Sequence, residues 1–107
     1  MTEVSIDQLR AARADGAVVV DVREPGEYVQ GHVPGARLIP LSQIPASAHE
    51  LPSVEPVYVI CASGNRSLRA SELLGRAGIN ARSVRGGTRG WVDAGQPVVT
   101  GPRADQS

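Results

Sequence analysis

Residues 57–67 read VYVICASGNRS and contain the change from strand to helix around which the rest of the chain is arranged. The β-branched, apolar run from Val57 to Ile60 predicts a buried strand. Residues 67–77 space three leucines among Arg, Glu and Ala, which predicts a helix closed by Gly78. Cys61, the only cysteine in the chain, therefore stands where the strand ends and a tight loop begins.

The loop after Cys61 has the composition of an anion-binding cradle. Gly64 and Asn65 tolerate left-handed backbone angles, so a short loop can turn successive N–H groups inward before the helix begins. Inward N–H groups at the positive end of a helix bind anions and favour a thiolate over a thiol. Arg66 adds a fixed positive charge at the rim, and we predict that Cys61 is a nucleophile rather than a small side chain retained for packing. The predicted substrate-binding residues are Ala62, Ser63, Gly64, Asn65, Arg66 and Ser67.

This loop and two further groups of motifs resemble the rhodanese family, sulfurtransferases whose active-site loop begins with a cysteine and typically reads Cys-x-x-Gly-x-Arg or a near variant. The first group is DVRE at 21–24, EY at 27–28 and GHVPGA at 31–36. The last group is GG at 86–87, Trp91 and GQPV at 95–98. The matches follow the order of the family and together cover the chain from about its first helix to Val99.

The resemblance implies an α/β domain of three layers, in which a mainly parallel central sheet is flanked by helices on both faces. The alternation of strands and helices favours the same architecture. Ser5 and Gln8 are spaced as a capping box for the first helix, and Trp91 is expected in the core. We expect strands at 17–22, 37–40, 57–60 and 80–84, helices at 1–13, 25–30, 67–77 and 88–93, and a short helix within 41–49.

Length, charge and cysteine usage narrow the class of protein. A chain of 107 residues suffices for one domain, expected over residues 1–99, and the polar residues 100–107 predict a flexible tail. The formal net charge is zero, so nothing favours a nucleic acid or a membrane as partner. A single cysteine, no signal-peptide pattern and no apolar run long enough for a bilayer predict a cytoplasmic protein. One Cys and two separated His show no metal-ligand spacing, and we expect no metal and no cofactor.

Asp21 and Arg23 follow the strand at 17–22, at the end that borders ligand crevices in open α/β sheets. A local interaction of Asp21, as a cap or as an ion pair with Arg23 or another arginine, is favoured over direct catalysis. The resemblance implies a similar role, in which the aspartate supports the site without performing the reaction.

Three other polar residues have weaker claims to the chemistry. His32 lies in a turn rich in Gly and Pro, so a structural hydrogen bond is favoured over a role as base for Cys61. Arg85 and Arg89 either add to the anion site or are solvated surface charges, and the sequence leaves both interpretations open.

The resemblance implies a two-step sulfur transfer without a cofactor. Cys61 would take a sulfane sulfur from thiosulfate or another persulfide donor, hold it as a persulfide, and pass it to a thiol or cyanide. The partners would be a small anionic donor and a thiophilic acceptor, or a sulfur-relay protein. Ala62 departs from the family pattern, because many members carry a basic or bulkier polar residue there, and the smaller positive charge disfavours thiosulfate as the physiological donor.

Two other functions stay open. Cys61 could belong to a persulfide carrier or docking module in sulfur trafficking, with little turnover on small donors. Phosphatases and arsenate reductases of the Cys-x5-Arg type use a loop that is one residue longer. Counting from Cys61 reaches arginine at position 66, and the longer spacing falls on Ser67, so the count disfavours this class.

Overall fold

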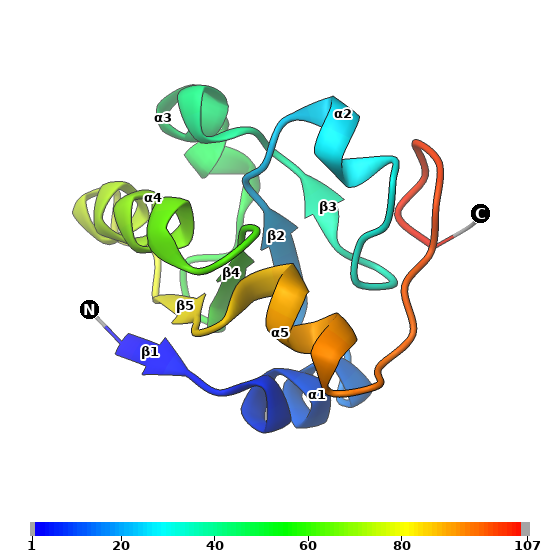
Figure 1. Ribbon diagram of the computed structural model, residues 1–107. Coiled ribbons are helices and arrows are strands. Elements are labelled where there is room, and N and C mark those ends of the chain that lie inside the picture. Colours follow the sequence, from blue (N-terminus) through cyan, green and yellow to red (C-terminus); the bar gives the residue numbers. More distant parts are fainter. Residues whose placement is uncertain (1, 106–107) are drawn as a thin grey trace.

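A five-stranded sheet forms the centre of the molecule, with strand order β1-β5-β4-β2-β3 and every neighbouring pair parallel (Figure 1). The computed structural model describes residues 2–105. All residues of the central strand β4 are buried, as its apolar sequence predicts. Because parallel strands end at the same edge, the carboxyl ends of β2, β4 and β5 lie together. The strands are β1 (Thr2–Val4), β2 (Val18–Asp21), β3 (Arg37–Leu38), β4 (Val57–Ile60) and β5 (Ala81–Val84).

Helices cover both faces of this sheet, which confirms the predicted three-layer α/β architecture (Figure 1). They are α1 (Ile6–Ala14), α2 (Pro25–Tyr28), η1 (Leu41–Gln43), α3 (Ile44–Ser47), η2 (Ala48–Glu50), α4 (Asn65–Arg76) and α5 (Gly87–Asp93). Within residues 2–105, no helix has both the length and the apolar character that crossing a membrane requires.

Successive side chains of β4 enter two different cores, because neighbouring residues of a strand point to opposite faces. Val57, Val59 and Cys61 belong to the core that α3 and α4 cover. Tyr58 and Ile60 belong to the core that α1 and α5 cover. Cys61 therefore continues the alternation of the strand and points to the α4 side.

The N-terminal segment differs from the prediction of one helix over residues 1–13. Thr2–Val4 forms the edge strand β1, which pairs with β5, and Val4 is buried in the core. Met1 lies outside the described residues. Ser5 sets the helix start: its hydroxyl accepts from Gln8 N at 3.1 Å, and its N–H donates to the Gln8 side chain at 2.7 Å. The predicted capping box is thus confirmed, and it leaves the residues before Ser5 free to pair with the sheet.

The strand at 57–60 has its predicted bounds, and the remaining predicted elements are present with shifted ends. Helix α4 begins two residues earlier than expected, at Asn65, because Gly64 takes a φ of +117° at the N-cap and turns the chain directly into the helix. Helix α2 begins at Pro25, as expected, but ends at Tyr28. The predicted inward position of Trp91 is confirmed, since its side chain is buried and its indole N–H donates to Pro97 O at 2.7 Å.

The described part of the C-terminal segment runs beside the turn that follows α2. Gly101 N donates to Val29 O and Gly35 N donates to Ala104 O, each at 2.8 Å. His32 and Val99 exchange two backbone hydrogen bonds. The flexibility predicted for residues 100–107 stays a prediction, and residues 106 and 107 lie outside the described part.

Helix α5 begins in close contact with the loop after β4. Thr88 N donates to Cys61 O at 2.8 Å, and Arg89 N donates to Ala62 O at 3.1 Å. Gly87 makes this approach possible, because a Cβ there would lie 2.5 Å from Ala62 O and 2.6 Å from Cys61 O. Its φ of +61° also favours glycine.

We predict that Gly87→Ala destabilises the fold far more than Gly95→Ala. Gly95 also has a positive φ, of +78°, but an added Cβ there meets nothing within 4 Å, so this control isolates the backbone strain. We expect a loss in the free energy of unfolding of about 1 kcal/mol for Gly95→Ala and about 3 kcal/mol for Gly87→Ala. Urea denaturation measures both, and equal losses would contradict the proposed backbone contact.

Candidate active site

The loop after β4 holds the Cys61 sulfur against backbone N–H groups. The strand ends at Ile60 and helix α4 begins at Asn65, so four residues make the turn. Gly64 N donates to Cys61 Sγ at 3.1 Å, and the Cys61 side chain is 1% exposed. The loop thus has the inward-facing donor expected of an anion cradle.

The hydrogen bonds of the loop favour the thiolate form of Cys61. Burial of the side chain is the largest single influence and raises its pKa. Hydrogen bonds from the Ser67 hydroxyl and from the backbone N–H groups of Ser67, Gly64 and Ser63 act in the opposite direction. Their combined effect is larger, so the pKa of Cys61 lies below its ordinary value. A buried thiol with a lowered pKa is suited to nucleophilic chemistry.

Ser67 lies in the first turn of α4 and connects the sulfur to strand β5. Its Oγ lies 3.6 Å from Cys61 Sγ, 2.8 Å from Ser83 Oγ, and 3.0 Å from Gly64 O, to which it can donate. Both serine side chains are fully buried. The sequence analysis identified Ser67 only through the loop and missed Ser83. The available signal was the alternation of the predicted strand, which places Ser83 on the same face as Ala81 and opposite to Arg82.

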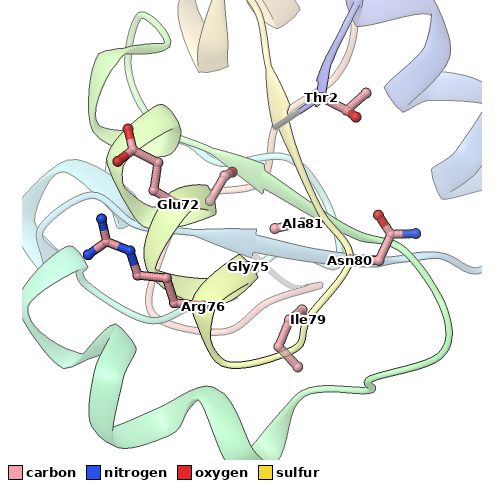
Figure 2. A pocket seen from close by; sticks show the side chains of 8 residues that line it. Thr2, Glu72, Gly75, Arg76, Ile79, Asn80 and Ala81 are labelled. Carbon is pink, nitrogen blue, oxygen red and sulfur yellow. The ribbon is translucent and has the colours of Figure 1, made fainter.

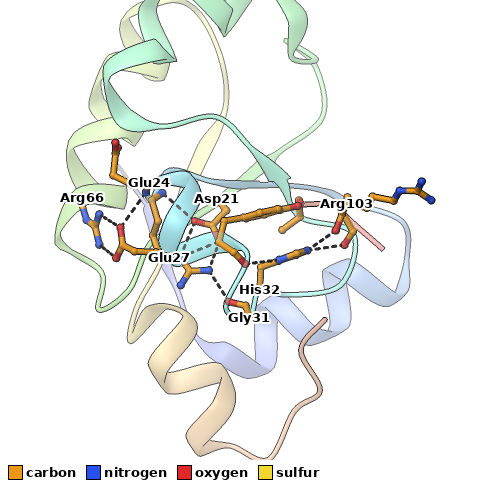
Figure 3. A network of polar contacts seen from close by, with 11 residues as sticks. Asp21, Glu24, Glu27, Gly31, His32, Arg66 and Arg103 are labelled. Atoms are coloured by element: carbon orange, nitrogen blue, oxygen red, sulfur yellow. Dashed lines mark hydrogen bonds and ion pairs between the residues drawn. The ribbon is translucent and has the colours of Figure 1, made fainter. Parts of the chain in front are cut away.

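Arg66 forms an ion pair with Glu27 of α2, as Figure 3 shows. The two terminal guanidinium nitrogens donate to the two carboxylate oxygens at 2.7 and 2.8 Å. The hydrogen bonds from Arg66, followed by one from the Glu24 backbone, lower the pKa of Glu27 to about 2, and the same pairing raises the pKa of Arg66. The predicted binding of substrate by Arg66 stays a prediction, and the structure adds a counter-ion that the sequence analysis missed.

Asp21 and Arg23 form a buried ion pair at the end of β2 (Figure 3). Arg23 Nη2 lies 2.8 Å from Asp21 Oδ2, and the same nitrogen donates to Gly31 O at 2.9 Å. The predicted local pairing of Asp21 is therefore present. Arg23 connects the end of β2 to the turn after α2, which is the arrangement expected of a supporting residue. Its effect on the reaction stays a prediction.

His32 makes structural contacts on both sides of its ring (Figure 3). The ring is buried, stacks on Tyr28 with 3.6 Å between ring centroids, and has Nδ1 2.8 Å from Tyr28 O. Its Nε2 lies 2.8 Å from Arg103 O. The predicted structural hydrogen bond is confirmed, and a backbone carbonyl oxygen lies within hydrogen-bond distance of each ring nitrogen.

Two shallow clefts share Arg23 and Val92, and one of them adjoins the Cys61 loop at Ala62. The cleft beside Ala62, of about 300 Å³, also contains Thr88, Arg89 and Asp93. The other, of about 460 Å³, is lined by Arg23, Glu27, Gln30, Gly31, Val92 and Val98. Of the two arginines left open by the sequence, Arg89 therefore lies beside the loop and Arg85 lines neither cleft, and both are exposed.

A third hollow lies away from the loop and is lined by none of the predicted site residues. It has a volume of about 470 Å³ and lies between α4 and the start of β5, with Thr2 at its edge (Figure 2). Because Ala62, the neighbour of Cys61, lines the cleft of about 300 Å³, we place the chemistry there. No group of three or more His, Cys, Asp or Glu side chains within the described residues could hold a metal ion.

Comparisons with known proteins agree with this geometry. Residues 5–94 match the family model described as Rhodanese-like domain. The thiosulfate sulfurtransferase GlpE of Pseudomonas entomophila is 36% identical over 89 residues, which cover 82% of each chain. The putative sulfur carrier protein YrkF of Bacillus subtilis is 38% identical over 75 residues, which cover 69% of this chain and 40% of that protein. The crystal structure of a rhodanese-related protein from Thermoplasma volcanium superposes with a TM-score of 0.86 at 34% identity, over 92% of this chain and 98% of that one.

We predict that the Glu27–Arg66 pair makes the free energy of unfolding depend on pH in the acid range. Folding lowers the pKa of Glu27 from 4.5 to about 2, so its contribution is complete above pH 4.5 and is lost as the pH falls through 2. Both side chains are more than one-third exposed, so solvent screens the pair and we expect about 1 kcal/mol or less.

Glu27→Gln should therefore lower stability at pH 7 and flatten the fall in unfolding free energy between pH 4.5 and 2, as measured by urea denaturation at a series of pH values. Glu55→Gln is the matched control, because Glu55 is exposed and has no ion pair within the described residues. An unchanged acid slope in Glu27→Gln would contradict the assigned pKa.

Proposed function

The chain belongs to the rhodanese-like family, and from this premise we propose that it is a sulfurtransferase that carries a sulfane sulfur as a persulfide on Cys61. The observation that supports this most directly is the position of Cys61 Sγ, which accepts from Gly64 N–H and adjoins the Ser67 hydroxyl. These groups favour a negative charge on sulfur, and both halves of a sulfur transfer need one.

In the first half, the Cys61 thiolate attacks the outer sulfur of the donor. With thiosulfate, a new S–S bond forms to Cys61 while the S–S bond of the donor breaks. Sulfite leaves with the bonding electron pair, and Cys61 becomes a persulfide anion. The N–H groups of residues 62–67 would hold the incoming anion and then the outer sulfur, as an oxyanion hole holds its charge.

In the second half, an acceptor attacks the outer sulfur of the persulfide. With cyanide, a C–S bond forms, the S–S bond to Cys61 breaks, and thiocyanate leaves. The electron pair returns to Cys61 as a thiolate, which the same hydrogen bonds stabilise. No electron is gained from or lost to any other reactant, so the cycle closes without a cofactor.

The charges near the loop favour a donor other than thiosulfate. Ala62 carries no charge, Arg66 is paired with Glu27, and Arg23 is paired with Asp21. Arg89 lines the adjoining cleft without an ion pair in the part of the chain that the structure describes. A doubly charged anion gains little from such a balanced surface, so we propose a low-molecular-weight or protein persulfide as the physiological donor.

The same balance favours a second candidate, a persulfide carrier that passes sulfur to a partner protein with little turnover on small donors. The related putative sulfur carrier makes this function chemically consistent with the fold. A carrier would keep its persulfide when cyanide is added slowly and at low concentration, whereas an enzyme would release thiocyanate repeatedly. Phosphatase chemistry is disfavoured because arginine follows Cys61 after four residues, one fewer than in the Cys-x5-Arg loop.

We predict that Cys61 gains one sulfur atom on incubation with thiosulfate or a small persulfide. Intact-protein mass spectrometry should show an increase of about 32 Da that disappears on adding cyanide. Cys61→Ser is the control and should show no increase. Absence of the increase with every donor would refute the sulfurtransferase proposal and make phosphatase and arsenate assays the next step.

We also predict that Ala62→Arg makes thiosulfate a better donor. A guanidinium beside the loop should attract the dianion and raise kcat/KM for thiosulfate about fivefold at low salt, with a smaller gain at high salt. Ala62→Gln adds similar bulk without charge and should leave the value near that of the original chain. Equal effects of the two substitutions in steady-state thiocyanate assays would show that charge at this position does not limit donor choice.

A further inference from the structure

Ser83 is a buried polar side chain near Cys61 that the proposed reaction does not use directly. It lies on β5, is fully buried, and pairs in register with Val59, two residues before Cys61. Because paired residues of neighbouring strands face the same side of a sheet, Ser83 shares the α4 side with Val59 and Cys61. Its Oγ lies 2.8 Å from Ser67 Oγ.

Ser67 has more partners than it has protons. Its hydroxyl carries one hydrogen and two lone pairs, and its three neighbours are Gly64 O, Cys61 Sγ and Ser83 Oγ. When Cys61 is a thiol, the S–H can donate to Ser67 Oγ while Ser67 donates to Gly64 O. When Cys61 is a thiolate, a hydrogen bond between these two side chains needs the Ser67 hydrogen, which must then turn away from Gly64 O.

The turn of the Ser67 hydrogen requires that Ser83 act as a donor. If Ser67 gave its hydrogen to Ser83, none would remain for the sulfur. If Ser83 donates to Ser67 Oγ, the Ser67 hydrogen is free to alternate between Gly64 O and Cys61 Sγ. A donor of this kind also polarises the Ser67 hydroxyl and strengthens the bond that it makes to the sulfur.

We propose that Ser83 is a positioning residue that directs the Ser67 hydroxyl onto the Cys61 sulfur whenever that sulfur carries negative charge. The inference rests on the proposed role of Cys61 as the sulfur-carrying nucleophile. It applies to the thiolate that attacks the donor and to the thiolate that leaves when the persulfide is discharged. Ser83 contacts no reacting atom and acts through Ser67.

The charged groups around the loop do not account for the stabilisation of negative charge on Cys61 that we assign to Ser67 and Ser83. Arg66 of α4 is held by Glu27 of α2, whose pKa of about 2 keeps it ionised throughout the neutral and alkaline range. Asp21 and Arg23 at the end of β2 are held in their own ion pair, and Arg89 of α5 lies beside Ala62. Burial raises the pKa of Tyr28 on the α2 side, which places its ionisation above that of an ordinary tyrosine. Because Cys61 is the only cysteine in the chain, a measurement of thiol reactivity reports on this residue alone.

The rate of Cys61 alkylation by iodoacetamide as a function of pH tests the proposal, because only the thiolate reacts. Ser83→Ala should raise the midpoint of this profile by about 0.5 to 1 pH unit, which lowers the thiolate fraction at a pH well below the midpoint about threefold to tenfold. Ser71→Ala is the matched control. Ser71 is a buried serine of α4 whose hydroxyl has no hydrogen-bond partner among the described residues, so its removal should leave the midpoint unchanged.

A double-mutant cycle separates positioning from packing. Ser67→Ala should raise the midpoint at least as far as Ser83→Ala, and adding Ser83→Ala to Ser67→Ala should cause no further shift. Ser83→Thr and Ser83→Val form a second pair of equal size, in which the threonine keeps the hydroxyl and should restore a midpoint below that of the valine variant. This pair decides the question if the alanine variant does not fold.

Two results would overturn the proposal: an unchanged midpoint in Ser83→Ala, or a shift in Ser83→Ala that persists in the Ser67→Ala background. The alkylation profile requires no sulfur donor. If the protein forms no persulfide but shows the predicted midpoint shifts, the proposed function is refuted and the role of Ser83 stands. If it forms the persulfide but shows no midpoint shifts, only the role of Ser83 is refuted.

Discussion

The loop that carries Cys61 is fixed by backbone contact with the start of α5, and the remaining features of the site depend on this contact. The carbonyl groups of Cys61 and Ala62 accept from Thr88 N and Arg89 N, and Gly87 permits the approach because a side chain there would overlap the loop. With these carbonyl groups directed toward α5, the N–H of Gly64 is directed to the sulfur. The conformation of the loop thus depends on two segments, one before β5 in the sequence and one after it.

Short-range hydrogen bonds, rather than a surplus of positive charge, support negative charge on the sulfur. The arginines of the loop and of the end of β2 are each held by a carboxylate, from Glu27 and Asp21. The donors nearest the sulfur are the N–H of Gly64 and the hydroxyl of Ser67. The Gly64 N–H is already oriented when charge develops, and salt screens such short-range donors less than it screens exposed ions.

The sequence predicts local structure correctly where that structure depends on residues that are close together in the chain. The capping box of Ser5 and Gln8 involves two residues of one helical turn, and the loop from Cys61 to Gly64 depends on a strand, a glycine and a helix that adjoin it. The predicted first helix extends too far toward the N-terminus, because the sequence of Thr2–Val4 by itself gives little indication of a strand. That segment becomes a strand only because β5 offers a free edge beside it.

The sequence by itself determined the fold class, the place of Cys61 at the end of a strand and the loop that follows it, because periodicity, glycine positions and the strand-to-helix change are all encoded within a few residues. Only the tertiary structure decided the partners of that loop. Glu27 lies 39 positions from Arg66, and Ser83 lies 16 positions from Ser67. Such pairs meet because parallel strands bring their carboxyl ends to one edge, and a one-dimensional pattern carries no information on which side chains will then come into contact.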